Sequence, residues 1–305
     1  MSLDTAKAIV TLNRLTQTFD ATVKAGTPWY PNVCTVVNST RKLEDYAGLG
    51  SMPGVREWLG DRVFHELRGA SFQIENKHWE DSLSIKKTDI NDDSMGLYPS
   101  FVEALGAEAV NHPDELFFQT LLAGETNACF DGQYFFDTDH SWGDSGTQSN
   151  LLTYNAADHT AVTVAEMKAA YHSARKTMVK YKNDNGKFLN RPTIGQQSSL
   201  TLLVPPELSV QAEEMVASTI ISNSTNVVLD RPKVVETPFL TAATDMYLFN
   251  LRGPLKPMVF QAREPITRQM KGMDDKETKD VKFMTEARYN VGYLAWWNSV
   301  LTTFN

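Results

Sequence analysis

The chain has few of the residues that mark several specialised classes of protein. Its 305 residues include only two cysteines, Cys34 and Cys129, too few for a disulfide framework or a paired-cysteine zinc site. We expect both to be inert free thiols in a reducing compartment. Lys and Arg number 29 against 37 Asp and Glu, a net charge of -8 that disfavours broad binding to a phosphate backbone.

Long hydrophobic runs are also missing. No apolar stretch approaches the roughly 20 residues needed to span a bilayer, and the start, MSLDTAKAIVTL, lacks the basic and apolar regions of a secretory signal. We therefore expect a soluble, intracellular product. The sequence contains no GxxxxGK[ST], GxGxxG, GxSxG or HExxH motif, which argues against an NTPase, a dinucleotide enzyme, a serine hydrolase or a zinc protease.

Hydrophobic periodicity predicts an α+β chain with a substantial core. Apolar residues at helical spacing predict helices over 3–24, 96–122 and 163–181, the last opened by a Thr-x-x-Glu capping box. Helices and strands follow one another without a repeated strand–helix–strand unit, which favours α+β over α/β. The later part of the chain carries the predicted strands, in the stretches SLTLLV, NVVLD, KVVET, MYLFNL, PMVFQARE and VKFMTEARYNVGYLAWW.

The second predicted helix contains a proline. Pro113 has no backbone N–H to donate within a helix, so we expect a kink or a restart there, capped by Asn111 or His112. Gly124 is the expected stop of this helix.

Two segments have an unusual balance of polar and apolar residues. The N-terminal helix leads into the turn-rich AGTPWYPN, and this pair can pack on another subunit as easily as on its own core. Residues 63–87 alternate like strands around a Gly-Ala-Ser turn, which predicts a long hairpin. Such a hairpin is marginal alone and needs a partner surface, because both faces are charged, through Arg62, Glu66, Arg68, Glu75, Lys77, Glu80, Asp81, Lys86 and Lys87.

The stretch ACFDGQYFFDTDHSWGDSG, residues 128–146, raises the question of a metal or catalytic site. Calcium loops need a late bidentate glutamate, which this stretch lacks, and zinc hydrolases use two or three His or Cys ligands, whereas His140 stands alone. We favour an irregular loop in which carboxylates cap turns and aromatics anchor the backbone. The alternative is a metal-dependent hydrolase that uses Asp131, Asp137, Asp139 and His140.

Five stretches together resemble the major head subunit family of Mu-like tailed phages, whose coat proteins have the Hong Kong 97-type fold. They are WLGDRVFHEL (58–67), IENKHWEDSLSIKKTDINDDSMGLY (74–98), CFDGQYFFDTDHSWG (129–143), LKPMVFQARE (255–264) and FMTEARYNVGYLAWW (283–297). In that family the third stretch belongs to a coat subunit without enzymatic duty. The resemblance therefore implies no catalytic residue, no metal and no cofactor.

The resemblance also implies an architecture. Residues 1–50 would form an N-terminal arm and residues 51–90 an extended loop containing the charged hairpin. Residues 91–204 and 254–305 would form a peripheral domain around a long spine helix, and residues 205–253 an axial domain near the five-fold and six-fold positions.

The function implied by the resemblance is that of a major capsid protein of a tailed double-stranded DNA bacteriophage or prophage. Copies would form pentamers and hexamers of an icosahedral head, assembled in the bacterial cytoplasm, that encloses DNA without sequence-specific binding and involves no membrane. Scaffold and maturation protease would be separate proteins, alongside a portal and decoration proteins. The nine charged residues of the hairpin region are the candidate intersubunit contacts. A binding module that adds its hairpin to a partner's sheet is a further alternative.

Overall fold

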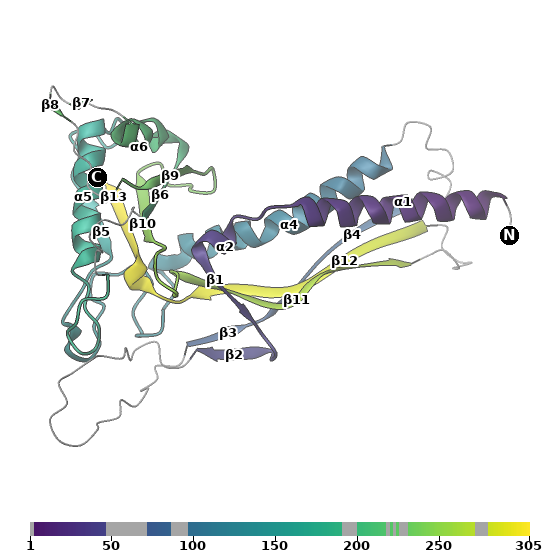
Figure 1. Cartoon of the computed structure of the whole chain (residues 1–305), viewed down its shortest axis with the longest axis horizontal. Helices are drawn as coiled ribbons and strands as arrows, with labels where there is room; N and C mark the ends of the chain where they lie inside the picture. The colour runs from purple at the N-terminus through teal and green to yellow at the C-terminus, as the bar shows by residue number, and fades with distance from the viewer. Residues whose placement is uncertain are drawn as a thin grey trace, which may run out of the picture.

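The computed structural model of the chain describes residues 3–46, 72–86, 97–190, 200–217, 220–221, 224–225, 231–271 and 280–305. The molecule is elongated (Figure 1), with the N-terminus at the far end of a long limb and the C-terminus in a wider body at the other end. We call these two parts the limb and the body. Both mix helices with sheet, so the α+β prediction is confirmed.

The limb consists of two long helices against a four-stranded sheet. Strands β11 and β12 form an antiparallel hairpin at its centre, β4 pairs antiparallel with β12 along one edge, and β1 pairs parallel with β11 along the other. The elements are α1 (Leu3–Ala25), α4 (Tyr98–Leu122), β1 (Cys34–Asn38), β4 (Lys77–Lys86), β11 (Met258–Lys271) and β12 (Asp280–Tyr293).

Helix α1 packs on its own chain. It lies along α4, and its Leu15 and Phe19 are buried with Val102 of α4 and Phe283 of β12 in a small core at the outer part of the limb. A Cβ on Gly106 of α4 would meet Thr22 of α1 at 3.2 Å, so the two helices approach closely here. Of the two arrangements open for the N-terminal helix, the structure shows the one within the subunit.

Helix α4 runs without interruption through Pro113, so the predicted restart with a cap at Asn111 or His112 is wrong. Proline removes one helical hydrogen bond, but Pro113 itself is buried and is followed by the buried Leu116 and Phe117. Tertiary packing on this stretch outweighs the local loss.

The predicted hairpin over 63–87 lies only partly within the described residues, and its described part, residues 72–86, pairs with other strands. Strand β3 (Phe72–Glu75) pairs with β2 (Leu43–Tyr46), and β4 pairs along its length with β12. Ile74 and Ile85 are buried by these pairings. The predicted Gly-Ala-Ser turn lies outside the described residues.

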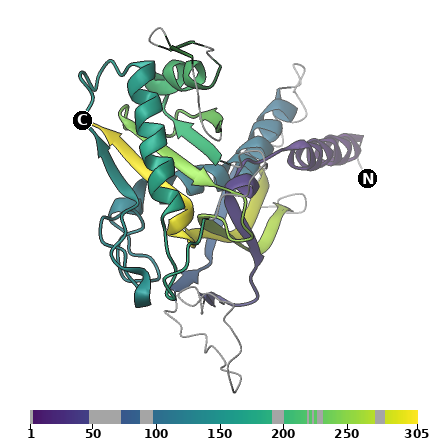
Figure 2. The same cartoon turned by 60° about the vertical axis from the view of Figure 1, so that its left-hand side comes forward.

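The body is a five-stranded sheet in the order β5-β13-β10-β6-β9, with two helices packed against it. Helix α5 contacts β10 and β13 and crosses the sheet (Figure 2), while α6 contacts β6 and β9. The elements are β5 (Leu151–Tyr154), α5 (Val164–Val179), β6 (Leu200–Val204), α6 (Pro206–Ala217), β9 (Lys233–Glu236), β10 (Asp245–Asn250) and β13 (Ser299–Phe304).

Strands from well-separated parts of the sequence meet in this sheet. β9 and β10 lie within the predicted axial range 205–253, but β10 is hydrogen-bonded to β6 and β13, which lie outside it. The five-stranded sheet therefore combines strands from inside and outside this range, while Ile220–Ile221 and Ser224–Thr225 pair with each other in a two-stranded sheet within it. The predicted strand NVVLD, residues 226–230, lies outside the described residues.

The main core is continuous from the body sheet to the base of the limb. It joins Phe249 and Leu301 of the body to Phe117 of α4 and Tyr289 of β12. Short elements complete the chain: α2 (Tyr30–Val33), η1 (Ala123–Glu125), η2 (Gly143–Ser145), β7 (Ile220–Ile221), β8 (Ser224–Thr225) and η3 (Trp296–Asn298). None of the described helices is long and apolar enough to cross a membrane.

Candidate functional site

The acidic, aromatic stretch forms an irregular segment between α4 and β5. Backbone bridges join Ala128 to Tyr134 and His140 to Gln148, and the turn between the first pair places Gly132 at a φ of 86°. Of the aromatics expected to anchor the backbone, Phe135 and Phe136 are buried and Trp142 is half-buried, whereas Tyr134 is exposed, so the prediction is wrong for Tyr134. The segment is thus a packed loop that the turn chemistry and aromatics of its sequence favour.

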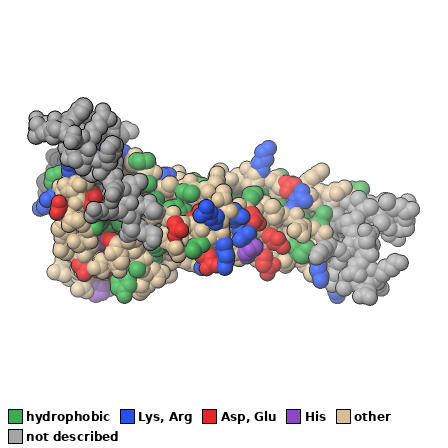
Figure 3. Space-filling view, turned by 90° about the horizontal axis from the view of Figure 1, so that it is seen from below, with side chains coloured by type: hydrophobic (Ala, Val, Ile, Leu, Met, Phe, Trp, Pro, Cys, Tyr) green, Lys and Arg blue, Asp and Glu red, His purple; other side chains and the backbone are tan. Residues whose placement is uncertain are grey.

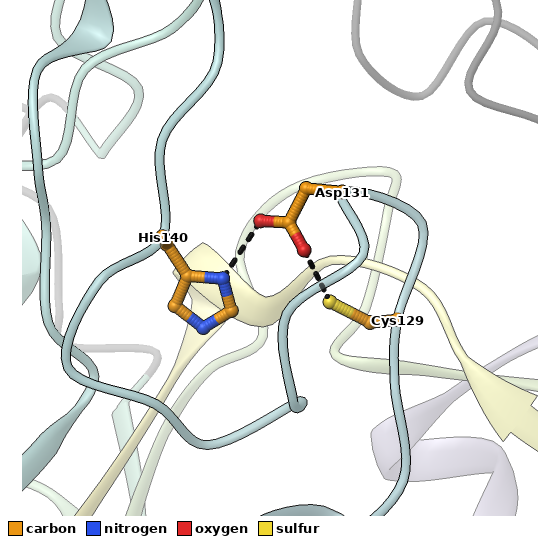
Figure 4. A group of neighbouring side chains, drawn as sticks. All are labelled: Cys129, Asp131 and His140. Atoms are coloured by element: carbon orange, nitrogen blue, oxygen red, sulfur yellow. Dashed lines mark hydrogen bonds and ion pairs between the residues drawn. The ribbon is translucent and has the colours of Figure 1, made fainter.

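Within this loop three side chains meet around one carboxylate (Figure 4). The Nδ1 of His140 lies 2.7 Å from Oδ2 of Asp131, and the Cys129 thiol donates to Oδ1 of Asp131 at 2.9 Å. The side chains of His140 and Asp131 are 0% and 2% exposed. We call Cys129, Asp131 and His140 the buried cluster.

Asn150 sets the orientation of the His140 ring. Its Nδ2 donates to the carbonyl oxygens of Phe135 and Trp296, so its Oδ1 faces the histidine and lies 3.2 Å from Nε2. The imidazole also stacks on Trp296, with ring centroids 3.9 Å apart and planes 9° from parallel. Both ring nitrogens therefore face side-chain oxygens, Nδ1 the carboxylate of Asp131 and Nε2 the amide oxygen of Asn150.

The pKa values of the cluster follow from burial and from these contacts. Burial raises the pKa of Asp131, but hydrogen bonds from His140 and Cys129 outweigh it, and the pKa lies below its usual value. Burial, together with the charge of Asp131, raises the pKa of the Cys129 thiol far above its usual value. In the absence of another cation the thiol keeps its proton and the carboxylate accepts from both neighbours.

The carboxylate set predicted for a hydrolase does not assemble. Only Asp131 and His140 of the four residues meet, and their third neighbour is Cys129. Asp137 accepts from the backbone N–H groups of Tyr134 and Thr138, which is a turn-capping role, and Asp139 is exposed.

Sequence reasoning missed Cys129 and Asn150. The spacing Cys-x-Asp places Cys129 and Asp131 in one turn, and this was the available signal for the thiol. The backbone bridge between His140 and Gln148 brings Asn150 close to His140. No local sequence pattern predicts this bridge.

The candidate intersubunit contacts lie in part on β3 and β4. Glu75 already pairs with Lys42 of its own chain at 2.8 Å, and this hydrogen bond holds the pKa of Glu75 below its usual value. Lys77 lies over the ring of Trp79, 6.0 Å from its centroid. The carboxylates of Glu80 and Asp81 accept hydrogen bonds from Ser82, and the Asp81 carbonyl accepts one from the Thr285 hydroxyl. Lys86 is exposed. The other candidates lie outside the described residues: Arg62, Glu66, Arg68 and Lys87.

Among the described residues, β4 is an edge strand of the limb sheet, and it carries acidic side chains next to one another. Glu80 lies directly opposite Glu286 of β12, and both are exposed. A hollow of about 180 Å³ opens between this edge and α4, lined in part by Glu80, Asp81, Glu108 and Glu286, with no Lys or Arg among its described lining residues. Figure 3 shows basic and acidic side chains mixed along the underside of the molecule.

Comparison with known sequences identifies one family. The model of the Mu-like prophage major head subunit gpT matches residues 9–166 and 160–240. The Mu-like prophage FluMu major head subunit of Haemophilus influenzae is 44% identical over 138 residues, which is 45% of each chain. The major capsid protein of Escherichia phage Mu is 37% identical over 111 residues, 36% of each chain. Each aligned stretch spans less than half of the relative's length.

Solved structures share the fold. A chain from the decorated capsid of bacteriophage JBD30 is 26% identical, with a TM-score of 0.56 over 70% of this chain and 90% of that one. The procapsid of JBD30 gives 24% identity and a TM-score of 0.57 over 100% of this chain and 77% of that one. A capsid chain of cyanophage P-SCSP1u is 10% identical in sequence, with a TM-score of 0.63 over 92% of this chain and 88% of that one.

The fold, with its long helix, long β-hairpin and separate body sheet, is thus that of phage capsid subunits of the Hong Kong 97 type. Since the family model covers more than half of the chain, this protein belongs to the Mu-like prophage major head subunit (gpT) family.

Proposed function

We propose that the chain is the coat subunit of a tailed double-stranded DNA phage or prophage and that its copies assemble into the pentamers and hexamers of an icosahedral head. The family match over residues 9–240 is the observation that carries this proposal. The fold supports it, since capsid chains from several phages align with more than nine-tenths of this chain.

A coat subunit needs many modest contacts rather than one tight site. Misplaced copies can then leave, while multiplicity holds the completed shell. An elongated subunit with a charged surface along its limb suits this requirement (Figure 3), because exposed ion pairs contribute only about 0–1 kcal/mol each and act mainly on register.

The parts of the molecule take the roles implied by the resemblance, with one revision. The limb serves as the peripheral domain with α4 as its spine helix, and the body sheet with α5 and α6 serves as the axial domain, in place of residues 205–253 alone. Residues 1–50 form the N-terminal arm, of which α1 and β1 pack on the limb of their own subunit. Residues 51–90 form the extended loop, whose last strand, β4, joins the limb sheet.

The edge at β4 is the contact surface that we place between neighbouring copies. Glu80 and Glu286 repel each other across the strands, and the adjoining hollow adds Asp81 and Glu108. A Lys or Arg side chain from a second copy relieves this repulsion and sets register. Among the predicted contacts, Glu80 and Asp81 therefore have the strongest support, while Glu75 has a partner within its own chain.

Other partners follow from the family. A separate scaffold, a maturation protease, a portal and decoration proteins complete the assembly, which takes place in the bacterial cytoplasm before the subunit becomes part of the virion. The net charge of -8 is compatible with a shell that encloses DNA without binding it tightly, because tight binding to phosphates requires clustered basic residues.

Electron microscopy of the overexpressed full chain tests the proposal. We expect shells, tubes or capsomers in negative stain, either from the chain alone or after co-expression with a scaffold protein of its phage. Light scattering gives the mass of the particles in the same samples. A chain that stays monomeric under both conditions and at all accessible concentrations contradicts the proposal and favours a binding module.

A further inference from the structure

We propose that Cys129, Asp131 and His140 form a structural binding site for one divalent transition-metal ion of the zinc type. This inference is independent of the coat function, because it concerns a site inside a single subunit.

The donor atoms converge and are of the right kinds. One sulfur, one carboxylate oxygen and one imidazole nitrogen all lie within 4.8 Å of one another. This mixed set of S, O and N donors matches the ligands that Zn²⁺ takes in proteins. The residues come from a single turn and the loop that follows it, so their spacing is set locally by the bridges of the segment.

The orientation of His140 is that of a metal ligand. Asn150 Oδ1 lies 3.2 Å from Nε2 and accepts its proton, and Asn150 is itself held by two backbone carbonyls. Metal-bound histidines usually have such a partner on the ring nitrogen that does not bind the metal. The Nδ1 atom is thereby aimed at Asp131 Oδ2 at 2.7 Å, and a neutral ring with its proton on Nε2 would set two lone pairs against each other there.

With the ion bound, the site carries no net charge. A neutral imidazole, the Asp131 carboxylate, the Cys129 thiolate and a divalent cation sum to zero. The protons that the ligands lose on binding pass to solvent. A neutral bound state avoids the main cost of burying an ion.

The required rearrangement is small. Bonds of about 2.0–2.3 Å to a tetrahedral ion place donors about 3.3–3.8 Å apart, against 2.7 and 2.9 Å for the two hydrogen bonds around Asp131. The carboxylate has to move by less than about 1 Å relative to its two partners. The third pair, the Cys129 sulfur and the His140 nitrogen, lies within 4.8 Å and has to close only to the same range.

A metal ion bound to the buried cluster would stabilise the folded loop between α4 and β5. The segment from the end of α4 to β5 contains a short 3₁₀ turn but no strand or α-helix between η1 and β5, and the cluster joins its first turn to the loop around His140. A ligand bound only by the folded chain stabilises it by mass action. The side chains of His140 and Asp131 are almost fully buried, as expected for a structural site.

Metal titration of the unassembled full chain tests the proposal. The protein is freed of metal with a chelator and titrated with Co²⁺ and, separately, with Zn²⁺. We expect one ion per chain by elemental analysis, a cobalt–thiolate absorption band, and a rise in Tm with Zn²⁺. Cys34→Ser serves as the matched control, since Cys34 is also a buried free thiol and is the only other cysteine.

The two cysteine variants show which thiolate binds the metal ion. Cys34→Ser should keep the band and the affinity, whereas Cys129→Ser should lose the band and bind at least about tenfold more weakly. A serine at 129 can still donate to Asp131, so the metal-free form of the loop is retained. If Cys129→Ser nevertheless fails to fold, the band in Cys34→Ser alone assigns the thiolate. Absence of stoichiometric binding and of any Tm shift, or equal binding by the Cys129→Ser chain, overturns the proposal.

Discussion

The buried cluster illustrates how single residues specify a loop without regular structure. Asp131 receives hydrogen bonds from His140, Cys129 and the backbone N–H of Gln133, and Asn150 closes the network on the other side of the ring. A buried ion pair adds little net stability over an apolar replacement, but removal of one partner leaves an uncompensated group.

Asp131→Asn should therefore be strongly destabilising. The Asp131 carboxylate contacts Cys129 through Oδ1 and His140 through Oδ2, whereas an asparagine has only one acceptor oxygen. One buried partner is then left unpaired, and the loss should be about 3–5 kcal/mol in the free energy of unfolding. Urea denaturation of the unassembled subunit measures it. Asp139→Asn, at an exposed position of the same loop, is the control and should change stability by less than about 0.5 kcal/mol. Equal midpoints for the two variants would show that the pair is not important for folding.

At the scale of elements, the attachment of α1 depends on apolar packing more than on charge. Phe19 is 2% exposed and its ring lies 5.4 Å from that of Phe283. Arg268 of β11 also binds Asp20 through two hydrogen bonds of 2.7 and 2.6 Å, but the carboxylate is 55% exposed. Solvent screening reduces the value of such a pair.

Phe19→Ala should release α1 from the limb. Truncation of a buried phenylalanine costs about 3–5 kcal/mol, whereas Asp20→Ala should cost less than about 1 kcal/mol. Hydrogen exchange of the α1 amides measures local release, and denaturation measures the total loss. Similar protection of α1 in the two variants would contradict the assignment of the attachment to packing.

The N-terminus of α5 provides a pH-dependent contribution. Glu166 accepts from the backbone N–H groups of Ala157 and Thr163 and from the Thr163 hydroxyl, and these bonds hold the pKa of Glu166 below its usual value. A depressed folded-state pKa means that the contribution is complete above the unfolded-state value of about 4.3 and is lost as pH falls through the folded-state value.

Glu166→Gln should therefore lower the Tm at pH 7 and have a smaller effect below about pH 4, where the wild-type carboxyl is also protonated. Thermal unfolding across this range gives the comparison. Glu213→Gln, at an exposed position of α6, is the matched control and should show no such convergence. If the difference in Tm between Glu166→Gln and wild type stays constant with pH, the Glu166 carboxylate does not provide this contribution.

At the scale of the whole molecule, one continuous core joins the body to the base of the limb, while the outer limb has a small core of its own. The limb, built of two helices and long strands, extends away from the body (Figure 1). Its charged strand β4 belongs to this limb, where we expect it to reach a neighbouring copy.

Glu80→Lys should separate folding from assembly. In the isolated subunit the new lysine faces Glu286 and replaces a repulsion by an attraction, so the Tm should stay the same or rise. If a basic group of a second copy sits at this edge, the same change should reduce the yield of shells in electron microscopy. Glu80→Gln should have an intermediate effect. Unchanged assembly of Glu80→Lys would remove this edge from the contact surface, while the coat function would still stand.

Much of the fold could be predicted from local patterns. The helices over 3–24 and 163–181, the capping box and the β11–β12 strands appear where the sequence predicts them, because amphipathic periodicity and cap residues act over a few positions. The helix restart predicted at Pro113 was wrong because packing around the proline outweighed a local rule. The pairing of β4 with β12 could not be predicted because strand partners are chosen over long sequence distances.

The sequence by itself determined the family, the α+β class and the packed, aromatic character of the loop at 128–146. Only the tertiary structure decided that β4 pairs with β12, that α1 lies on its own α4, and that Cys129 and Asn150 complete the surroundings of Asp131 and His140. The physical reason is that helix and turn propensities depend on neighbouring residues. Strand partners and buried polar networks depend instead on which residues, distant in the sequence, pack together and exclude water.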